Sequence, residues 1–527
     1  MCPKHGARRR IISSLGIDER PFETIPRGNR ALCKNMIRTR YAPSPTGALN
    51  VGGARTALFN YLFARQQGGK FVLRIEDTDL ERSDKKYEKD IFESLRWLGI
   101  EADESPEQGG SYAPYRQSER TPIYQKYIEK LLGDGLAFYC FHSETELENE
   151  KNELMSVKKP VLHLCEYRSM DPKEAEILKD AKREYILRFK TPLGRKIVFQ
   201  DLIRGELSFE SDLLGDFSIA KRPDLPLYNF AVVADDETMK ISHVIRGEDH
   251  ISNTPKQILL IEALGFQTPQ YAHLPLILGT DRSKLSKRHG AAGVSEYRAE
   301  GYLSDALFNF MALLGWSPGN DREILSQEEL IREFSLERVQ KSGAIFDTTK
   351  LEWMNGYYIR QKSVKELIKL CTPFLEEVGL MKAQSARFAS EARRVKRKAQ
   401  KEYLEKIIAL EQPRLKKLSE LPERVDYFFR APKYEKDLLR WKDMSDEELR
   451  IALQEILLIF KDYAKAGGSE LEKTFFSKIG SGDKGRLLWP LRAALSGKKA
   501  SPGPFEIIAV LGVEEAQKRV KTASALL

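Results

Sequence analysis

The stretch that constrains the fold most is residues 37–62, where a strand pattern changes abruptly into a helix pattern. Apolar residues and arginines alternate over residues 37–41, with the period of two that is typical of a strand with unlike faces. Pro43 and Pro45 end this strand, because proline cannot donate to a β-ladder. After Gly53 the apolar residues recur at helical spacing. The stretch therefore predicts a strand, a loop and a helix in direct succession.

The loop itself contains Gly47, Gly52 and Gly53, which we expect to supply permissive backbone in the turn. A strand that leads through such a loop to a helix N-terminus forms an anion site, because unpaired N–H groups and the positive end of the helix dipole face the ligand. In open α/β sheets these sites lie at the carboxyl ends of the strands. A glycine loop alone is weak support for nucleotide binding, so the rest of the chain must decide.

A second signal is the short basic loop Asp281-Arg-Ser-Lys-Leu-Ser-Lys-Arg288. Together the two segments resemble the paired signatures of class I aminoacyl-tRNA synthetases. Further segments narrow the resemblance to glutamyl-tRNA synthetases of bacterial type: Ala42-Pro-Ser-Pro-Thr-Gly47, Arg74-Ile-Glu-Asp-Thr-Asp79, Val244-Ile-Arg-Gly-Glu-Asp-His250, Asn253-Thr-Pro255 and Trp353-Met-Asn-Gly356. The resemblance runs from about residue 36 to the C-terminus and is more specific before residue 360 than after it.

The resemblance implies an α/β Rossmann-type catalytic domain with an inserted acceptor-binding domain, followed by all-α anticodon-binding domains. A chain of 527 residues is too long for one hydrophobic core. The expected division is residues 36–117 and 226–275 for the Rossmann domain, 118–225 for the inserted acceptor-stem domain, 276–363 for a stem-contact fold and 364–527 for the helical anticodon-binding region. The helical pattern of the last region matters, since glutaminyl and eukaryotic relatives read the anticodon with β-barrels.

Residues 1–35 precede the first strand and begin with several arginines. We expect them to be a disordered leader or to lie upstream of the true start, which Met36 would provide. An organellar transit peptide is a second interpretation, but its Asp18, Glu19 and Glu23 count against it. A short docked extension is a third. Five scattered cysteines and the lack of an apolar run of about 18 residues predict a cytoplasmic protein that does not enter a membrane.

The resemblance also implies which residues bind the amino acid, L-glutamate. Arg40 is the candidate for its side-chain carboxylate, because a guanidinium pairs with a carboxylate through two hydrogen bonds. Arg246 would make a second carboxylate contact, and Glu76 would contact the amino group. The remaining pocket residues are Ala42, Ser44 and Tyr228. Arg55 lies nearby on a helix, where it can simply face solvent.

ATP and Mg²⁺ are the implied cofactors. Lys284 and Lys287 would meet the negative charge of the leaving pyrophosphate, and Ser286, Gly52 and Gly53 would complete this part of the site. Asn50 is the main departure, since it replaces the first histidine of the family signature and cannot carry charge. The other residues of the matching motifs are Pro43, Thr46, Gly47, His250, Leu285 and Arg288.

Cys140, His142, Cys165 and Tyr167 stand where related bacterial enzymes carry a zinc site. Tyr167 is a weak ligand for a structural zinc ion, which prefers nitrogen and sulfur. His163 is an alternative fourth ligand, and two buried free cysteines without metal are the alternative to a zinc site.

The implied reaction has two steps. Glutamate attacks the α-phosphate of ATP to give glutamyl-adenylate, and the glutamyl group then passes to the terminal adenosine of tRNA(Glu). We expect a monomer, and the sequence leaves open whether tRNA(Gln) is charged as well. Asn50 keeps a catalytically weakened tRNA-binding paralogue as the alternative. A basic cluster in residues 382–401 would either neutralise tRNA phosphates or form a solvated helix face.

Overall fold

The computed structural model describes residues 36–79, 81–157, 162–163, 165–286, 293–382, 393–465, 471–479 and 482–527. The expected leader, residues 1–35, lies outside the described residues, as do Lys287, Arg288 and residues 383–392 of the segment that carries the expected basic cluster. No helix in the described part of the chain is long and apolar enough to cross a membrane.

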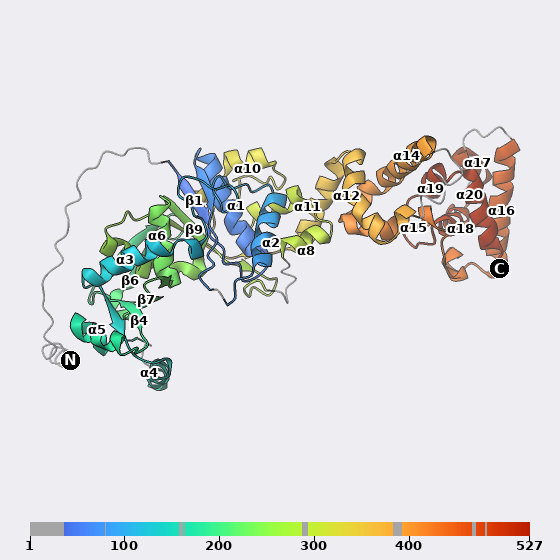
Figure 1. Ribbon diagram of the computed structural model, residues 1–527. Coiled ribbons are helices and arrows are strands. Elements are labelled where there is room, and N and C mark those ends of the chain that lie inside the picture. The colour runs from blue at the N-terminus through green and yellow to red at the C-terminus, as the bar shows by residue number, and fades with distance from the viewer. Residues whose placement is uncertain are drawn as a thin grey trace, which may run out of the picture. The chain divides into compact units, whose positions relative to one another are not determined.

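The sheet that carries the predicted site is built from segments far apart in sequence (Figure 1). β1 (Arg38–Tyr41) pairs in parallel with β2 (Lys70–Leu73). On the other side of β1, the Ser242 N–H donates to the Arg38 carbonyl at 3.0 Å, immediately before β9 (His243–Gly247). β9 pairs in parallel with β10 (Gln270–Leu274). The predicted strand, loop and helix are thus confirmed, with α1 (Val51–Gln66) following β1.

The sheet continues into the range expected for the inserted domain. β10 also pairs in parallel with β5 (Lys196–Asp201), which forms an antiparallel hairpin with β6 (Gly205–Glu210). The order in this part of the sheet is β6-β5-β10-β9. A separate antiparallel sheet has the order β3-β4-β7-β8. Its strands are β3 (Ala137–Cys140), β4 (Ile186–Phe189), β7 (Ser218–Arg222) and β8 (Leu225–Pro226).

The remaining elements up to residue 361 are mostly helices. They are α2 (Lys85–Trp97), α3 (Thr121–Gly133), α4 (Glu144–Ser156), α5 (Pro172–Asp180), α6 (Tyr228–Thr238), α7 (Thr254–Leu264), α8 (Val294–Ala299), α9 (Ser304–Ala312), α10 (Gln327–Glu333) and α11 (Thr348–Gln361), with the short strands β11 (Ile277–Leu278) and β12 (Ala344–Ile345). The 3-10 helices of this part are η2 (Gln117–Glu119), η3 (Glu166–Ser169), η4 (Ser211–Leu213), η5 (Glu248–Asn253) and η7 (Leu336–Arg338).

After residue 363, the described chain forms helices only, as the sequence pattern predicts (Figure 1, orange to red). They are α12 (Val364–Glu377), α14 (Arg393–Glu411), α15 (Leu421–Phe429), α16 (Asp446–Lys465), α17 (Leu471–Ile479), α18 (Gly485–Ser496), α19 (Pro504–Leu511) and α20 (Val513–Ser524), with η8 (Gln412–Arg414), η9 (Leu418–Glu420) and η10 (Lys436–Leu439). These helices share a hydrophobic core that includes Leu367, Ile407 and Phe428 and that Leu303 and Ile359 of the preceding part also join.

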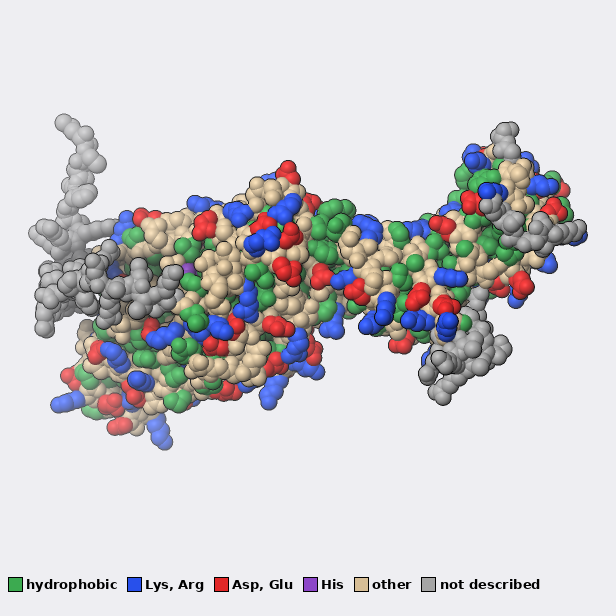
Figure 2. All heavy atoms as spheres, turned by 90° about the horizontal axis from the view of Figure 1, so that it is seen from above, with side chains coloured by type: hydrophobic (Ala, Val, Ile, Leu, Met, Phe, Trp, Pro, Cys, Tyr) green, Lys and Arg blue, Asp and Glu red, His purple; other side chains and the backbone are tan. Residues whose placement is uncertain are grey.

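The surface carries mixed charge. On the face shown in Figure 2, Lys and Arg side chains are interspersed with Asp and Glu rather than gathered into one patch. This mixture agrees with a net charge of only +9 over 527 residues. A nucleic-acid interface on this protein therefore has to be argued from local contacts rather than from overall charge.

Candidate active site

A cavity of about 1440 Å³ opens at the carboxyl ends of β1 and β9 and collects most of the predicted site residues. The predicted residues that line it are Arg40, Ala42, Ser44, Thr46, Gly47, Asn50, Gly52, Gly53, Glu76, Tyr228, Arg246, His250, Lys284, Leu285 and Ser286. Pro43 does not line the cavity, but its carbonyl accepts a hydrogen bond from the Glu76 N–H at 2.9 Å. This bond ties the loop after β1 to the chain that follows β2.

The loop before α1 presents the N-terminus of that helix to the cavity, and no acidic side chain lies in the first turn. Asn50 is the N-cap, and its Oδ1 accepts from the Gly53 N–H at 2.9 Å. The side-chain amide of Asn50 is thereby left with its N–H₂ group as donor. Gly47, Gly52 and Gly53 do not adopt a positive φ, contrary to the expected need for permissive backbone. Gly53 is instead required by packing, because a Cβ there would lie 2.5 Å from the Tyr41 hydroxyl.

Arg40 is held from behind by a buried ion-pair network. Its Nε lies 3.2 and 3.3 Å from the two oxygens of Asp236. Asp236 also accepts from Nη1 of Arg74 at 2.7 Å, and Nη2 of Arg74 donates to Glu76 at 2.9 Å. Arg40 and Glu76 are therefore fixed relative to one another through two side chains that lie between them. Burial raises the pKa of Glu76 above its usual value, which Arg74 opposes.

A third carboxylate, Asp235, contacts this network from the far side. Asp235 is fully buried, lies 3.6 Å from Nε of Arg74 and accepts from Nε of Arg120 at 2.6 Å. Tyr124 also donates to Asp235 at 3.0 Å. Three arginines, at positions 40, 74 and 120, thus face three carboxylates, at positions 76, 235 and 236, so the network is balanced in charge.

Arg246 is different, because it is buried without an acidic partner. It is 5% exposed, and no carboxylate in the described part of the chain lies within ion-pair distance of it. Its Nε donates to His273 at 3.2 Å and its Nη2 donates to Thr254 at 2.9 Å. Its Nη1 is buried and has no hydrogen-bond partner. Since an isolated buried charge is costly, this guanidinium marks where an anion would be bound.

Tyr228 and His250 form a polar pair in the same cavity. The Tyr228 hydroxyl lies 3.0 Å from Nδ1 of His250. Burial and the neighbouring Arg246 lower the pKa of His250 to about 4, so this ring is neutral at pH 7. Burial raises the pKa of Tyr228, which keeps its hydroxyl protonated. Both side chains therefore offer neutral hydrogen-bonding groups beside Arg246.

The basic loop reaches the cavity through Lys284. This side chain is 66% exposed, and its Nζ lies 3.6 Å from a carboxylate oxygen of Asp249. The loop is attached to β11, since the Leu285 N–H donates to the Ile277 carbonyl at 2.9 Å. Lys284 is thus an exposed cation at the rim of the cavity, on a loop that backbone hydrogen bonds attach to β11.

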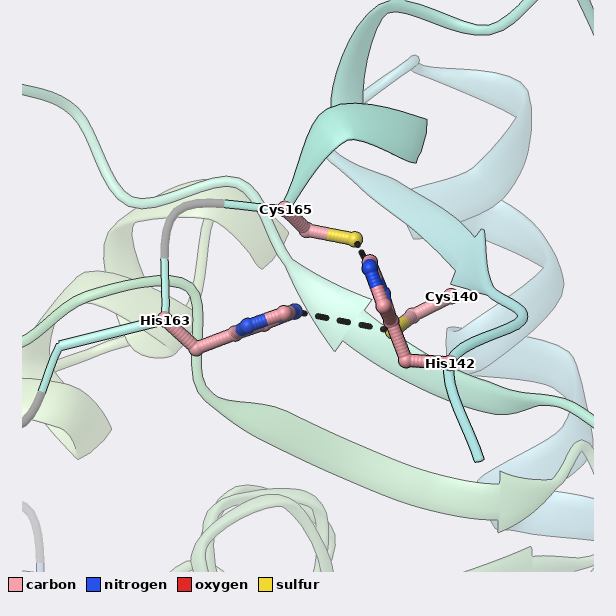
Figure 3. A group of neighbouring side chains, drawn as sticks. All are labelled: Cys140, His142, His163 and Cys165. Carbon is pink, nitrogen blue, oxygen red and sulfur yellow. Dashed lines mark hydrogen bonds between the residues drawn. The ribbon is translucent and has the colours of Figure 1, made fainter. Parts of the chain in front are cut away.

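A second cluster of chemistry-bearing side chains lies at the end of β3 (Figure 3). Cys140, His142, His163 and Cys165 point toward one another, and their ligand atoms all lie within 4.8 Å of one another. Cys140 Sγ lies 3.4 Å from His142 Nδ1 and 3.7 Å from His163 Nε2, and Cys165 Sγ lies 3.6 Å from His142 Nδ1. Tetrahedral ligands at zinc–ligand distances of about 2.0–2.3 Å are roughly 3.3–3.8 Å apart, so the donor set fits zinc.

The fourth member of the cluster is His163 rather than Tyr167. The Tyr167 hydroxyl accepts a hydrogen bond from Nη2 of Arg183 at 3.0 Å. Its ring packs edge-on against the His142 ring, with the two ring centroids 4.9 Å apart. His163 is oriented by Glu150, whose Oε2 lies 2.5 Å from its Nδ1. A carboxylate behind a histidine is a common arrangement around metal ligands, because it fixes the ring and its tautomer.

Sequence reasoning missed the side chains that hold the site from behind. Arg55 does not face solvent. It is 3% exposed, and its guanidinium donates to the carbonyls of Pro275 at 2.5 Å and Leu314 at 3.2 Å. Asp235 and Asp236 had a detectable signal, because two adjacent acids follow an apolar run on α6. His273 and its partner Asp201 had none.

The comparisons with known proteins agree with this geometry. Residues 36–353 match the catalytic domain of class I tRNA synthetases (E and Q), and residues 366–524 match an anticodon binding domain. A glutamate–tRNA ligase of Carboxydothermus hydrogenoformans is 47% identical over 492 residues, which cover 92% of this chain and 99% of that protein. The chain belongs to the glutamate–tRNA ligase family. The fold class and the family predicted from the sequence are thereby confirmed.

Two further relatives extend the family match. Glutamate–tRNA ligase 1 of Caldicellulosiruptor saccharolyticus is 48% identical over 496 residues, covering 92% of this chain and 98% of that protein. Among solved structures, a glutamate tRNA ligase from Elizabethkingia meningosepticum in complex with its amino acid has a TM-score of 0.81 and 34% identity, and the match covers 93% of this chain and 99% of that chain.

Proposed function

We propose that the chain ligates L-glutamate to tRNA(Glu) in two steps, through a glutamyl-adenylate formed from ATP. The observation that carries this proposal is Arg246, a buried guanidinium in the cavity for which the described residues supply no acidic partner and leave one nitrogen unsatisfied. A substrate carboxylate would supply the missing charge and the missing hydrogen bond. Family membership supports the same substrate, since the matched relatives are glutamate–tRNA ligases.

Within this proposal, Arg40 and Arg246 bind the side-chain carboxylate of glutamate from two sides. Arg40 is suited to this because only its Nε is paired with Asp236. The outer edge of its guanidinium is left to face the cavity. Glu76 would receive the α-amino group, an assignment supported by its fixed position on Arg74. Ala42, Ser44 and Tyr228 complete the amino-acid pocket. The α-carboxylate then remains free to attack the phosphate.

ATP would bind with Mg²⁺ over the N-terminus of α1, where the first turn lacks acidic residues. Asn50 would donate its amide N–H to a phosphate, and Lys284 would leave Asp249 to meet the pyrophosphate. Mg²⁺ would neutralise phosphate charge when bound. The catalytic contribution of the chain's own residues is positioning and charge stabilisation rather than a covalent intermediate.

The direct test is aminoacylation with radiolabelled glutamate on tRNA(Glu) and tRNA(Gln), assayed separately. Charging of tRNA(Glu) is expected. Charging of tRNA(Gln) as well would mean that another enzyme must convert the product to glutaminyl-tRNA. Failure to charge either tRNA, with the protein folded, would contradict the proposal and favour a weakened tRNA-binding paralogue.

Restoring the family histidine at position 50 is expected to raise the rate of ATP–pyrophosphate exchange by about tenfold, because a histidine can carry positive charge beside the phosphates. The same Asn50→His change should cost about 1 kcal/mol of stability through loss of the helix N-cap. Asn50→Asp is the control, since it keeps the cap and removes the donor. An unchanged or lower exchange rate in Asn50→His would count against a phosphate role for this position.

We also propose that Cys140, His142, His163 and Cys165 hold a structural zinc ion. The proposal is supported by the mutual distances of the ligand atoms and by Glu150 behind His163. When bound, zinc would join the end of β3 to the start of η3, a connection that no covalent bond supplies.

Elemental analysis of the purified protein is expected to find about one zinc ion per chain. His163→Ala should lose the metal, whereas Tyr167→Phe should retain it. Cys371→Ser serves as the cysteine control, because Cys371 is buried in the C-terminal helices and belongs to a different core. Equal zinc content in His163→Ala and the wild type would contradict the ligand set.

The partner of the helical region after residue 363 is proposed to be the anticodon arm of tRNA. The match to an anticodon binding domain supports this assignment. We further propose that the enzyme acts as a monomer in the cytoplasm, a reducing compartment that suits the three described cysteines, which form no disulfide. Gel filtration with light scattering checks the oligomeric state.

A further inference from the structure

Three neighbouring strands contribute one polar side chain each to a continuous row behind the cavity. Asp201 ends β5, His273 lies on β10 and Arg246 lies on β9. The parallel register sets this row, because His273 and Arg246 are direct partners across β10 and β9. The side chains of Asp201 and His273 are fully buried. These two side chains have no contact with solvent, so their hydrogen bonds determine their protonation and geometry.

The hydrogen bonds fix which nitrogen of His273 carries the proton. Oδ2 of Asp201 lies 2.6 Å from Nδ1 of His273, and Oδ1 of Asp201 accepts from the backbone N–H groups of Ile203 and Arg204. Burial lowers the pKa of His273 below its usual value, so the ring is neutral at pH 7. A neutral ring that donates through Nδ1 has a lone pair on Nε2. That lone pair faces Nε of Arg246 at 3.2 Å, and the Thr254 hydroxyl lies 3.1 Å from the same His273 nitrogen.

The row therefore determines how Arg246 presents its charge. His273 accepts a hydrogen bond from Nε of Arg246, and Thr254 accepts one from Nη2. The remaining Nη1 has no hydrogen-bond partner among the described residues. Without an acceptor at His273, the guanidinium could rotate about its long side chain and lose this orientation. Since no carboxylate of the described residues pairs with Arg246, its orientation depends on these neutral acceptors and on the ring of Tyr271, whose centroid lies 5.6 Å from the guanidinium carbon.

We propose that His273, held in one tautomer by Asp201, is a positioning residue that orients Arg246 toward the substrate carboxylate. The inference rests on the proposed role of Arg246 in binding glutamate. It extends that role to two side chains that do not touch the substrate. Neither Asp201 nor His273 lines the cavity.

Two amide substitutions of His273 separate positioning from simple structural support. In His273→Gln, the longer side chain can place its carbonyl oxygen where Nε2 lies and keep the acceptor for Arg246. In His273→Asn, the shorter side chain can place its N–H₂ where Nδ1 lies and keep the donor to Asp201. The two variants are both polar amides, and they differ in which hydrogen bond of the row survives.

The two variants are expected to rank in one order for the KM for glutamate and in the opposite order for thermal stability. The KM for glutamate should rise about 30-fold in His273→Asn and less than about threefold in His273→Gln, because only the latter retains the hydrogen bond to a charged group. The KM for ATP should stay within about twofold in both. Thermal unfolding should show the reverse order, with His273→Gln the less stable variant, because it leaves the buried Asp201 without its side-chain donor.

A merely structural role predicts that the less stable variant is also the poorer at binding glutamate, so a parallel order in the two measurements would overturn the proposal. Arg246→Lys is assayed beside them. If Arg246→Lys leaves the KM for glutamate unchanged, the proposed role of Arg246 itself fails. If it raises that KM while both His273 variants match the wild type, only the positioning role fails.

Discussion

Replacing Arg246 by methionine is expected to raise the KM for glutamate by roughly 30- to 5000-fold. Removal of one partner of a buried, hydrogen-bonded charge pair costs about 2–5 kcal/mol, which corresponds to roughly 30- to 5000-fold in affinity. Arg246 is 5% exposed and has no carboxylate of its own in the described part of the chain, so the substrate would be its partner. Steady-state aminoacylation at varied glutamate and saturating ATP measures the effect.

The change should leave the fold intact, and this separates it from ordinary core damage. Methionine removes the buried charge of the Arg246 guanidinium. In the free protein, Nη1 of that guanidinium has no hydrogen-bond partner among the described residues. Thermal stability without glutamate should therefore stay close to that of the wild type, while stabilisation by added glutamate should disappear. Arg246→Lys should be intermediate, because lysine retains the charge but not the planar fork. An unchanged KM for glutamate in Arg246→Met would remove the principal support for the glutamate site.

The largest expected loss of stability follows from replacing Arg74 by methionine. Arg74 is fully buried and lies within ion-pair distance of Glu76, Asp235 and Asp236. Breaking a buried ion pair by removing one member costs about 3–5 kcal/mol, because the other charge is left uncompensated. The midpoint of denaturant unfolding, followed by a probe in the catalytic part, should fall accordingly. Glutamate binding should weaken too, since Asp236 would lose the partner that fixes it against Arg40.

Arg82→Met is the matched control for Arg74→Met. Arg82 pairs with Asp79 at 2.6 Å, but its side chain is 76% exposed. An exposed pair of this kind contributes about 0–1 kcal/mol, so the control should unfold close to the wild-type midpoint. Similar destabilisation by both changes would show that burial of the network around Arg74 does not carry the stability assigned to it.

The parts of the site that the sequence predicts are those in which local pattern and chemistry coincide. The change from strand period to helix period around Gly53 locates α1, and the resemblance of the flanking segments identifies Arg40, Glu76, Tyr228 and Arg246. The structure brings these residues to one cavity. The absence of strand signals after residue 364 predicts the helical region, since strands and helices leave different periodicities.

The supporting residues could not be predicted in the same way. Arg40 and Asp236 are 196 positions apart, and His273 and Asp201 are 72 apart. The first pair joins β1 to α6 and the second joins β10 to β5, so both depend on how distant elements pack, which periodicity does not encode. The alternation of arginines on β1 also misleads, because it suggests one polar face, whereas both faces are buried and the arginines are satisfied by ion pairs. The sequence predicts Tyr167 as the fourth zinc ligand and His163 only as the alternative, because chain folding, not spacing, brings His163 to Cys140.

The most direct test of the central claim is the discrimination between glutamate and glutamine as the amino acid in charging of tRNA(Glu). The two differ in that glutamine lacks the charge which Arg246 and Arg40 are proposed to bind. A site built around a buried, unpaired guanidinium should favour glutamate by about a thousandfold or more in kcat/KM. Comparable efficiency with the two amino acids would contradict the account, because the unpaired charge would then not select the substrate.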